Sequence, residues 1–421
     1  MSTMEAFEIA KQTLQKIVTE EVPFALAIRG SFKKNDVDLK QRGDITALLG
    51  CELRHHYLLD NLIERFCNNA IFEDTIYLRF LVANKLFLKR FDNDALYALA
   101  CQGVSKEEVD NLLLFISSTN EIIPSEFDKT SPEYLSMRFN TPAWVIKMWQ
   151  KQFGKGLVFK ILKVNYRSSI PTVRVNNLNC SSQEILDKYP DFVASPVEDI
   201  LIYNGRGTPK NLDEFRNDKI FFMKMATKYV LDRLEIEPLK GIAIYSDVPN
   251  NIYLDLIARF GPQLSADIII HHVQSYFETK RIRDSRGYKN LRLYNAEASS
   301  IITCISNPVN TFICLPKSTT FDLFRSTPDY FLRIKQEKLD EFIAEETAAL
   351  EECAAHVEVG GKLVYMVPTI SKKESTNLIG NFLFAHHDYE LVEEKQFFPF
   401  ESFDSCLYYA ILRKIDEPKQ D

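Results

Sequence analysis

The sequence has no long apolar run, no CxxC cysteine pair and no glycine-rich nucleotide-binding motif. Its eight cysteines are scattered singly along 421 residues. Isolated thiols do not build a zinc or disulfide framework, so we expect small core residues in a reducing compartment. No stretch approaches the roughly 20 apolar residues of a membrane span. Walker, HExxH and nucleophile-elbow patterns are also missing, so the enzyme classes that depend on them are not indicated.

Basic residues are fewer than acidic ones, 51 against 58, and the formal net charge is −7. This balance argues against a large general affinity for nucleic acid, which depends on phosphate neutralisation, but it permits a local basic face. Hydrophobic residues make up 46% of the chain, enough for real cores, and the length predicts two or three domains. The first residues are polar and amphipathic without an apolar signal core, so we expect a cytoplasmic protein.

The periodicity of apolar residues changes along the chain. Residues 1–128 repeat them at helical spacing, which predicts an all-α bundle. Residues 129–215 include the strand-like run 170–176 and predict a small α+β unit. From 216 to 416 strands and helices alternate, which predicts a doubly wound, Rossmann-like domain. We therefore expect an α+β multidomain protein with these three domains.

Particular elements are expected within the alternating part. One helix is predicted over 218–234 and a long amphipathic helix over about 329–357. Gly360 and Gly361 are expected to end the long helix, because glycine favours helix ends. The next strand is then expected at 363–367.

Several stretches, in order along the chain, resemble the Sun/Fmu (RsmB-type) family of bacterial 16S rRNA cytosine-C5 methyltransferases. They are ITALLGCELRHHYLLDNLI at 45–63, SPEYLSMRFNTPAWVIKMW at 131–149, VRVNNL at 173–178, STPDYF at 326–331, GGKLVY at 360–365 and CLYYAILRK at 406–414. The resemblance implies a NusB-like helical domain, a small RNA-binding subdomain and a Rossmann-like methyltransferase domain. It also implies RNA, in particular rRNA, as the partner, a protein partner for the NusB-like domain, and S-adenosylmethionine as the family's cofactor.

The family's chemistry needs a cysteine thiolate that adds to C6 of cytosine, and a second cysteine that aids release. The resemblance places Lys317 at the first thiol position and Pro368 at the second. Lysine is normally protonated and proline has no nucleophile. Cys314 takes the position of a base-orienting aspartate and lies three residues before the expected nucleophile, a shift of about 10 Å along a strand. A buried thiol is therefore the preferred interpretation of Cys314.

The loop that would approach the cofactor is also altered. A Rossmann first loop uses glycine so that the backbone can come close to its ligand. Pro249 matches the family, but Asn250 and Asn251 stand where the family has glycines, and Ile244 stands where it has an aspartate. We expect the two asparagine side chains to crowd the ligand, and hence no tight binding of S-adenosylmethionine.

The second strand of the domain should end in an acid that holds the ribose hydroxyls. It ends instead in His271 and His272, whose side chains point to opposite faces of a strand, so we expect no metal site. Glu297 is the one family-like acid that remains, where the resemblance implies an aspartate facing adenine.

Two groups of residues are candidates for RNA contact. Arg174 and Asn176 are candidates by resemblance, and an ordinary polar strand face is the alternative. The densest basic run, interleaved with Tyr276, Phe277 and Tyr288, is the other group, with a solvated helix face as its alternative. It consists of Lys280, Arg281, Arg283, Arg286, Lys289 and Arg292.

Three functions are consistent with these features. Loss of both cysteines, both glycines and two acids favours a catalytically inactive RNA-binding or assembly protein that keeps the methyltransferase fold. The first alternative is an active S-adenosylmethionine-dependent rRNA cytosine-C5 methyltransferase with unusual catalytic residues. The second alternative is a protein-interaction module without RNA binding, which the acidic balance permits.

Overall fold

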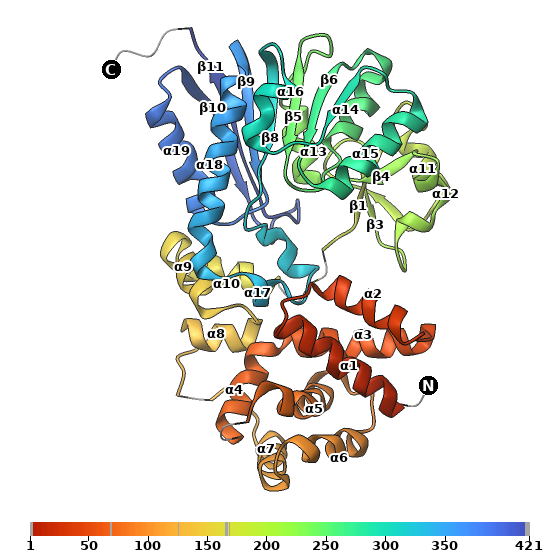
Figure 1. Cartoon of the computed structure of the whole chain (residues 1–421), viewed down its shortest axis with the longest axis vertical. Helices are drawn as coiled ribbons and strands as arrows, with labels where there is room; N and C mark the ends of the chain where they lie inside the picture. Colours follow the sequence, from red (N-terminus) through yellow and green to blue (C-terminus); the bar gives the residue numbers. More distant parts are fainter. Residues whose placement is uncertain (1–2, 68–69, 125, 165–166, 168, 417–421) are drawn as a thin grey trace. The chain divides into compact units, whose positions relative to one another are not determined.

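The computed structural model describes residues 3–67, 70–124, 126–164, 167 and 169–416. The chain divides into two compact units. One comprises Met1–Arg167 with Leu323–Gln336, and the other comprises Ser168–Asp322 with Glu337–Asp421. Figure 1 gives the element labels.

The first unit is helical and surrounds one apolar core, which includes Leu14, Leu48, Leu59, Phe80 and Val109. Side-chain caps fix several helix starts; Ser105, for example, forms a capping box with Glu108. Its helices are α1 (Thr3–Val18), α2 (Phe24–Lys34), α3 (Leu39–Arg54), α4 (His56–Phe66), α5 (Phe72–Ala83), the π-helical turn η1 (Asn84–Leu88), α6 (Asn93–Gly103), α7 (Lys106–Ser118), α8 (Pro132–Phe139), α9 (Ala143–Phe153), α10 (Lys155–Lys163) and α17 (Tyr330–Arg333). The predicted N-terminal helical bundle is confirmed.

The segment 323–336 belongs to this first unit although it comes late in the sequence. Asp329 accepts a hydrogen bond from the backbone of Phe24 (3.0 Å) and pairs with Arg333 (2.8 Å). The single long helix predicted over 329–357 is therefore wrong. The helix α17 ends at Arg333, and α18 (Leu339–Ala355) begins in the second unit, because the chain changes unit between them.

The second unit begins with a small antiparallel sheet of order β2-β3-β1-β4. Its strands are β1 (Thr172–Val175), β2 (Phe192–Ala194), β3 (Ile200–Tyr203) and β4 (Ile220–Phe222), and the helices α11 (Ser182–Lys188) and α12 (Asp213–Arg216) accompany them. The helix predicted over 218–234 is wrong in its first part. Residues Ile220–Phe222 pair with β1 instead, and the helix α13 covers only Met225–Asp232.

The larger sheet has seven strands in the order β10-β11-β9-β8-β5-β6-β7. The five strands from β5 to β9 are parallel, and β10 and β11 are antiparallel to their neighbours. They are β5 (Ile242–Ser246), β6 (Ala266–Ile270), β7 (Leu291–Tyr294), β8 (Val309–Leu315), β9 (Val357–Val367), β10 (Tyr389–Phe397) and β11 (Leu407–Lys414). The helices between them are α14 (Ile252–Phe260), α15 (Val273–Arg286), α16 (Ile301–Cys304), α18 and α19 (Thr376–Ala385). This alternation confirms the predicted Rossmann-like sheet.

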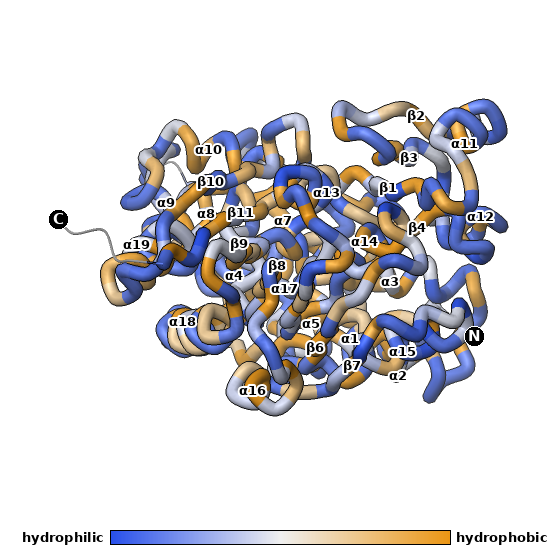
Figure 2. The backbone as a smooth tube through the Cα atoms, turned by 90° about the horizontal axis from the view of Figure 1, so that it is seen from above, coloured by the Kyte–Doolittle hydropathy of each residue, from blue (hydrophilic) through white to orange (hydrophobic). Residues whose placement is uncertain are grey.

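Both faces of the sheet are covered, so its central strands are mainly apolar, although β6 contains Asp267 and β8 contains Asn310 (Figure 2 colours the backbone by hydropathy). Side chains alternate between faces: Ile244 packs in the core shared with α13 and α14, whereas Tyr245 packs in the core shared with α18 and α19. Gly360 and Gly361 lie inside β9 and do not end a helix, which corrects their predicted role. A side chain at Gly361 would lie 2.8 Å from the carbonyl of Asn310, so the glycine permits close strand contact. Among the described helices, none has the length and apolar character that crossing a bilayer requires.

Candidate functional site

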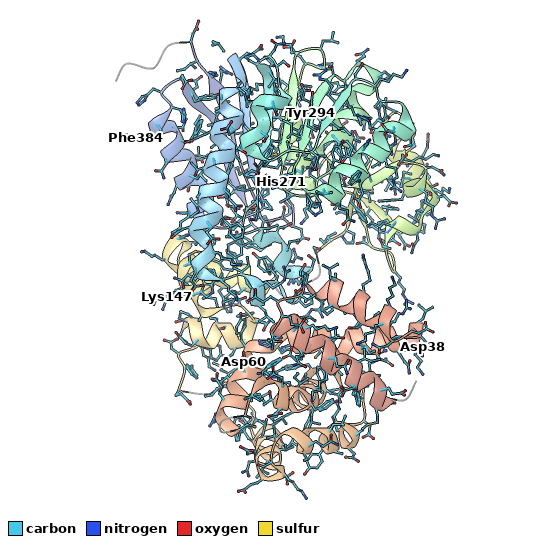
Figure 3. The ribbon with its side chains drawn as sticks, viewed as in Figure 1. Asp38, Asp60, Lys147, His271, Tyr294 and Phe384 are labelled. Carbon is cyan, nitrogen blue, oxygen red and sulfur yellow. The ribbon has the colours of Figure 1, made fainter. Side chains whose placement is uncertain are left out.

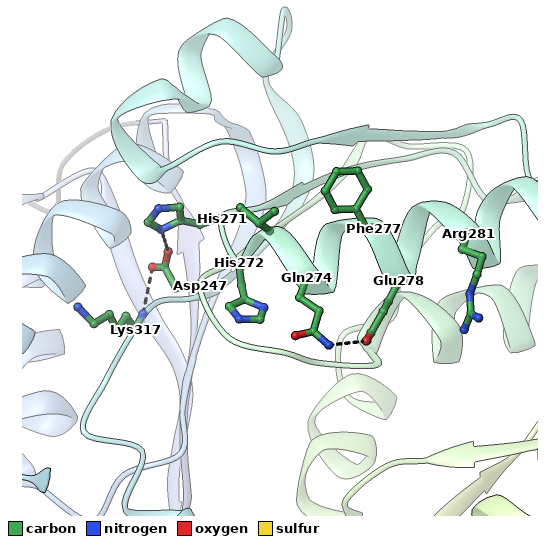
Figure 4. A pocket seen from close by; sticks show the side chains of 9 residues that line it. Asp247, His271, His272, Gln274, Phe277, Glu278, Arg281 and Lys317 are labelled. Carbon is green, nitrogen blue, oxygen red and sulfur yellow. Dashed lines mark hydrogen bonds and ion pairs between the residues drawn. The ribbon is translucent and has the colours of Figure 1, made fainter. Parts of the chain in front are cut away.

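The order of the large sheet reverses between β5 and β8, and ligands of such sheets bind outside the carboxyl ends of the strands at this reversal. Asp247 follows β5, His271 follows β6 and Lys317 follows β8. These three residues line a hollow of about 1080 Å³, which α15 borders with Gln274, Phe277 and Arg281 among others (Figure 4). The hollow therefore lies where a Rossmann-like domain holds its ligand.

Asp247 joins the ends of three strands (Figure 4). Its Oδ1 accepts hydrogen bonds from the hydroxyl of Tyr245 (2.7 Å) and from Nδ1 of His271 (2.8 Å), and its Oδ2 accepts one from the backbone of Lys317 (3.0 Å). Burial and the neighbouring carboxylate raise the pKa of Tyr245, so its phenol stays a donor. A carboxylate has about four acceptor positions, so one remains for a ligand. No pattern in the sequence distinguishes Asp247 from other acids that lie in loops.

The asparagines of the first loop turn away from this hollow. The side-chain nitrogen of Asn250 donates to Ser246 Oγ (2.8 Å), and its oxygen accepts from the backbone of Ile252 at the start of α14 (3.1 Å). Asn251 donates to the carbonyl of Phe222 in β4 (2.8 Å). Neither residue lines the hollow, and Pro249 does not line it either. The crowding that we expected from the two asparagines is therefore not seen in the structure.

Glu297 lies in a second hollow, of about 750 Å³, at the end of β7. Its carboxylate accepts a hydrogen bond from Ser299 Oγ (2.9 Å), and Cys304 lines the same hollow. His271 lines both hollows, so the hollow of Asp247 and the hollow of Glu297 adjoin at this residue. His272 caps α15 by accepting from the backbone of Ser275 (3.2 Å). Within the described ranges no group of three or more histidine, cysteine or acidic side chains is arranged to hold a metal ion.

The two positions that the resemblance gives to thiols hold Lys317 and Pro368. The ammonium of Lys317 pairs with Glu345 (2.9 Å) and lies over the ring of Phe342 (5.4 Å to its centroid). Pro368 follows β9, and its carbonyl accepts from the backbone of Asp322 (3.3 Å). Cys314 is 0% exposed and packs in the core shared with α18, as the buried-thiol interpretation expects.

A buried pair of glutamates connects the loops after β8 and β9. Glu374 accepts hydrogen bonds from the backbone and hydroxyl of Thr319 (2.7 and 2.9 Å) and from the hydroxyl of Thr369 (2.8 Å). Glu346 of α18 is 0% exposed and faces Glu374. Burial and then the charge of Glu374 raise the pKa of Glu346 to about 11. Two such carboxyls do not both ionise, so Glu346 holds the proton, and neither of its oxygens has a hydrogen-bond partner among the described residues.

The sequence matches no protein-family model. It is similar to the probable ribosomal RNA small subunit methyltransferase B of Bacillus subtilis (strain 168), at 21% identity over 410 residues that cover 91% of this chain and 89% of the relative. The resemblance to the Sun/Fmu methyltransferases is confirmed. It extends along nearly the whole chain, through both compact units.

Solved structures share the fold. PH0851 has a TM-score of 0.77 at 19% identity and covers 98% of this chain and 99% of its own. NSun6 from Pyrococcus horikoshii with SFG has a TM-score of 0.58 at 12% identity, over 65% of this chain and 98% of its own. A methyltransferase homolog protein from Pyrococcus horikoshii also scores 0.58, at 14% identity, over 67% and 98%. The second unit therefore has a methyltransferase fold.

The residues that the family resemblance offered for RNA contact are buried. Arg174 is 2% exposed, and its Nε pairs with Asp255 Oδ1 at 2.8 Å. Asn176 is also 2% exposed, and its side-chain nitrogen donates to the carbonyl of Asp218 (3.0 Å). Both side chains hold β1 and the residue after it to neighbouring segments, so Arg174 and Asn176 are buried structural contacts, which neither the RNA contact nor the ordinary polar strand face describes.

The basic run is partly neutralised by acids. Arg283 pairs with Asp284 (2.6 Å), Arg286 with Asp218, and Arg292 with both oxygens of Asp267 (2.6 and 2.7 Å). The other three cations are exposed and form no ion pair with any residue that the structure describes. They are Lys280, Arg281 and Lys289. The basic run therefore has three unpaired charges, rather than six, that could contact a polyanion.

Proposed function

We propose that this homologue of rRNA methyltransferases binds RNA without methylating C5 of cytosine. The observation that carries the proposal is the ammonium of Lys317, paired with Glu345 at 2.9 Å where the chemistry needs a thiolate. Addition to C6 begins with a free electron pair, and a protonated amine has none. Pro368, at the second thiol position, has no acid or base group to aid release of the product.

No described cysteine of the second unit replaces the missing nucleophile. Four of these thiols are buried, including Cys314 and Cys353 inside the core. Cys304 is partly exposed, but it lies in the hollow at the end of β7, and burial raises its pKa. A thiol with a raised pKa stays protonated near neutral pH, and the thiolate is the reactive form.

S-adenosylmethionine is the ligand whose chemistry the first hollow suits best, and it would supply a methyl group when bound. Asn250 and Asn251 leave the hollow open, and Asp247 keeps one acceptor position for an ammonium or hydroxyl of the ligand. Glu297 offers a second acceptor at the end of β7. These contacts support the alternative of a retained cofactor, against our expectation of no tight binding.

The division of the chain into domains at 1–128, 129–215 and 216–416 remains a prediction.

Methyl transfer tests the proposal directly. The unaltered chain is incubated with methyl-labelled S-adenosylmethionine and 16S rRNA, beside a Lys317→Cys, Pro368→Cys variant that restores both thiols. We expect no label in the RNA from the unaltered chain. Incorporation that survives Cys314→Ala would reveal an unrecognised nucleophile, and incorporation lost in that variant would identify Cys314 as the nucleophile. Either result overturns the inactive assignment.

Cofactor and RNA binding are measured separately, because each can persist without methyl transfer. Calorimetry with S-adenosylmethionine distinguishes a retained ligand, seen as saturable micromolar binding, from the empty pocket predicted from the sequence. RNA binding is followed as a function of salt, since phosphate contacts give a linear dependence of log affinity on log salt concentration. A chain that shows no salt-dependent RNA binding would instead be a protein-interaction module.

A further inference from the structure

The chain has one long stretch without negative charge. Residues 134–183 contain no aspartate or glutamate, although 58 acidic residues are spread over the 421 positions. The same stretch contains eight basic residues: Arg138, Lys147, Lys151, Lys155, Lys160, Lys163, Arg167 and Arg174. A protein with a net charge of −7 thus concentrates positive charge in one segment.

Two consecutive helices of the first unit, α9 and α10, present most of this charge. Their apolar side chains are buried, Val145, Ile146 and Trp149 on α9 and Val158, Ile161 and Leu162 on α10. Lysines occupy the exposed positions of both helices, and Figure 3 labels Lys147 on α9. We call Lys147, Lys151, Lys155, Lys160 and Lys163 the lysine face.

Three lysines of the lysine face carry charge that no described acid neutralises. Lys147, Lys151 and Lys163 form no ion pair within the described part of the chain. Lys163 instead lies over the ring of Phe159, 4.7 Å from its centroid. Lys155 donates to the hydroxyl of Thr130 (3.2 Å). Acids pair with three of the six cations in the 280–292 run, whereas the segment 134–183 contains no acid that could pair with its neighbours in the sequence.

We propose that the lysine face binds the phosphate backbone of RNA; the inference rests on the proposed RNA-binding function. Lys147 and Lys151 are four residues apart on α9, so they project from the same side of the helix at neighbouring positions. Lysine is a mobile point charge that contacts phosphate without reading sequence. Such a surface positions an RNA and leaves its recognition to other residues.

The composition of the surface favours RNA over a lipid membrane. A helix that lies on a membrane needs a large exposed apolar face beside its cations. No large apolar side chain that the structure describes between 143 and 163 is mostly exposed. The apolar faces of α9 and α10 are already buried in the first unit. The exposed side offers charge alone, which matches a polyanion.

The test compares two triple variants of the full chain that remove the same charge. One is Lys147→Ala, Lys151→Ala, Lys163→Ala, and its matched control is Lys280→Ala, Arg281→Ala, Lys289→Ala. Affinity for a 20-nucleotide oligouridine is measured over a range of salt concentrations. Each lost phosphate contact on a single strand flattens the log–log slope by about 0.7, so three should flatten it by about 2. We expect this change in the first variant and a smaller one in the control.

The outcomes separate this inference from the proposed function. If the unaltered chain binds the RNA and the first variant keeps its slope, the lysine face is not the site, although RNA binding stands. If the unaltered chain does not bind RNA at all, the proposed function fails and this inference with it. Anionic vesicles and polyglutamate serve as other polyanions. If either binds as tightly as the RNA, and the first variant loses that binding equally, RNA is not the specific partner of the lysine face. Circular dichroism confirms that both variants are folded.

Discussion

Replacing Glu346 with glutamine tests the proton held on Glu346 in the second unit. Glutamine has the shape of a protonated glutamate and stays neutral at every pH of the experiment. In the folded protein the pKa of Glu346 is raised from 4.5 to about 11 by burial and by Glu374. The stability that this group contributes is therefore complete below about pH 4.5 and is lost as the pH rises towards 11.

The size of the change in the free energy of unfolding depends on how far the pH lies above the pKa of Glu346 in the unfolded chain. At pH 7 the unfolded chain ionises this carboxyl and the folded chain keeps it neutral, which costs about 1.4 kcal/mol per pH unit above 4.5. The penalty is then about 3 kcal/mol at pH 7. Because glutamine does not titrate, Glu346→Gln should be more stable by up to about this amount, and the gap should widen by about 1.4 kcal/mol per pH unit between pH 6 and pH 8.

The two units permit an internal control. Both tryptophans of the chain, Trp144 and Trp149, lie in the first unit, so their fluorescence reports its unfolding alone. Urea unfolding followed by circular dichroism should show a transition that Glu346→Gln moves to higher urea, while the fluorescence transition stays unchanged. Glu374→Gln is the matched variant. It should destabilise the second unit, because three donors lose a charged acceptor. If the difference in stability between Glu346→Gln and the unaltered chain does not widen from pH 6 to pH 8, Glu346 does not hold a proton in the folded protein.

Three further predictions concern the stability of the folded chain, each measured as the free energy of unfolding in urea. Arg174→Met removes one of the two arginines that pair with Asp255, which is 0% exposed, and should cost up to about 3 kcal/mol, because Arg259 remains beside the carboxylate; an unchanged free energy would contradict a buried ion pair. Gly103→Ala places a side chain 2.2 Å from a carbonyl of α5 and should destabilise the first unit, whereas Gly30→Ala, in open space on α2, should stabilise it by about 0.5–1 kcal/mol. Ser131→Ala removes the hydroxyl that caps α8 and should cost about 1 kcal/mol; retention of full stability would show that the cap is dispensable.

The sequence by itself determined the features that depend on local pattern and residue type. Helical periodicity identified the N-terminal bundle, and alternation identified the parallel sheet, because each element buries an apolar face at a fixed spacing. Residue identity was enough to show that Lys317 and Pro368 cannot supply a thiolate. The acid-free stretch 134–183 can also be read directly from the letters.

The tertiary structure decided which side chains meet. It joined Asp247 to His271 and Lys317, and it brought Glu346 to Glu374 across 28 positions of sequence. No local pattern encodes such pairings, since they follow from the order of strands in the sheet. Burial is equally non-local: it withdrew Arg174 from the surface and left Lys147 on it. The charge of a residue is written in the sequence, but its neighbours and its access to solvent are properties of the fold.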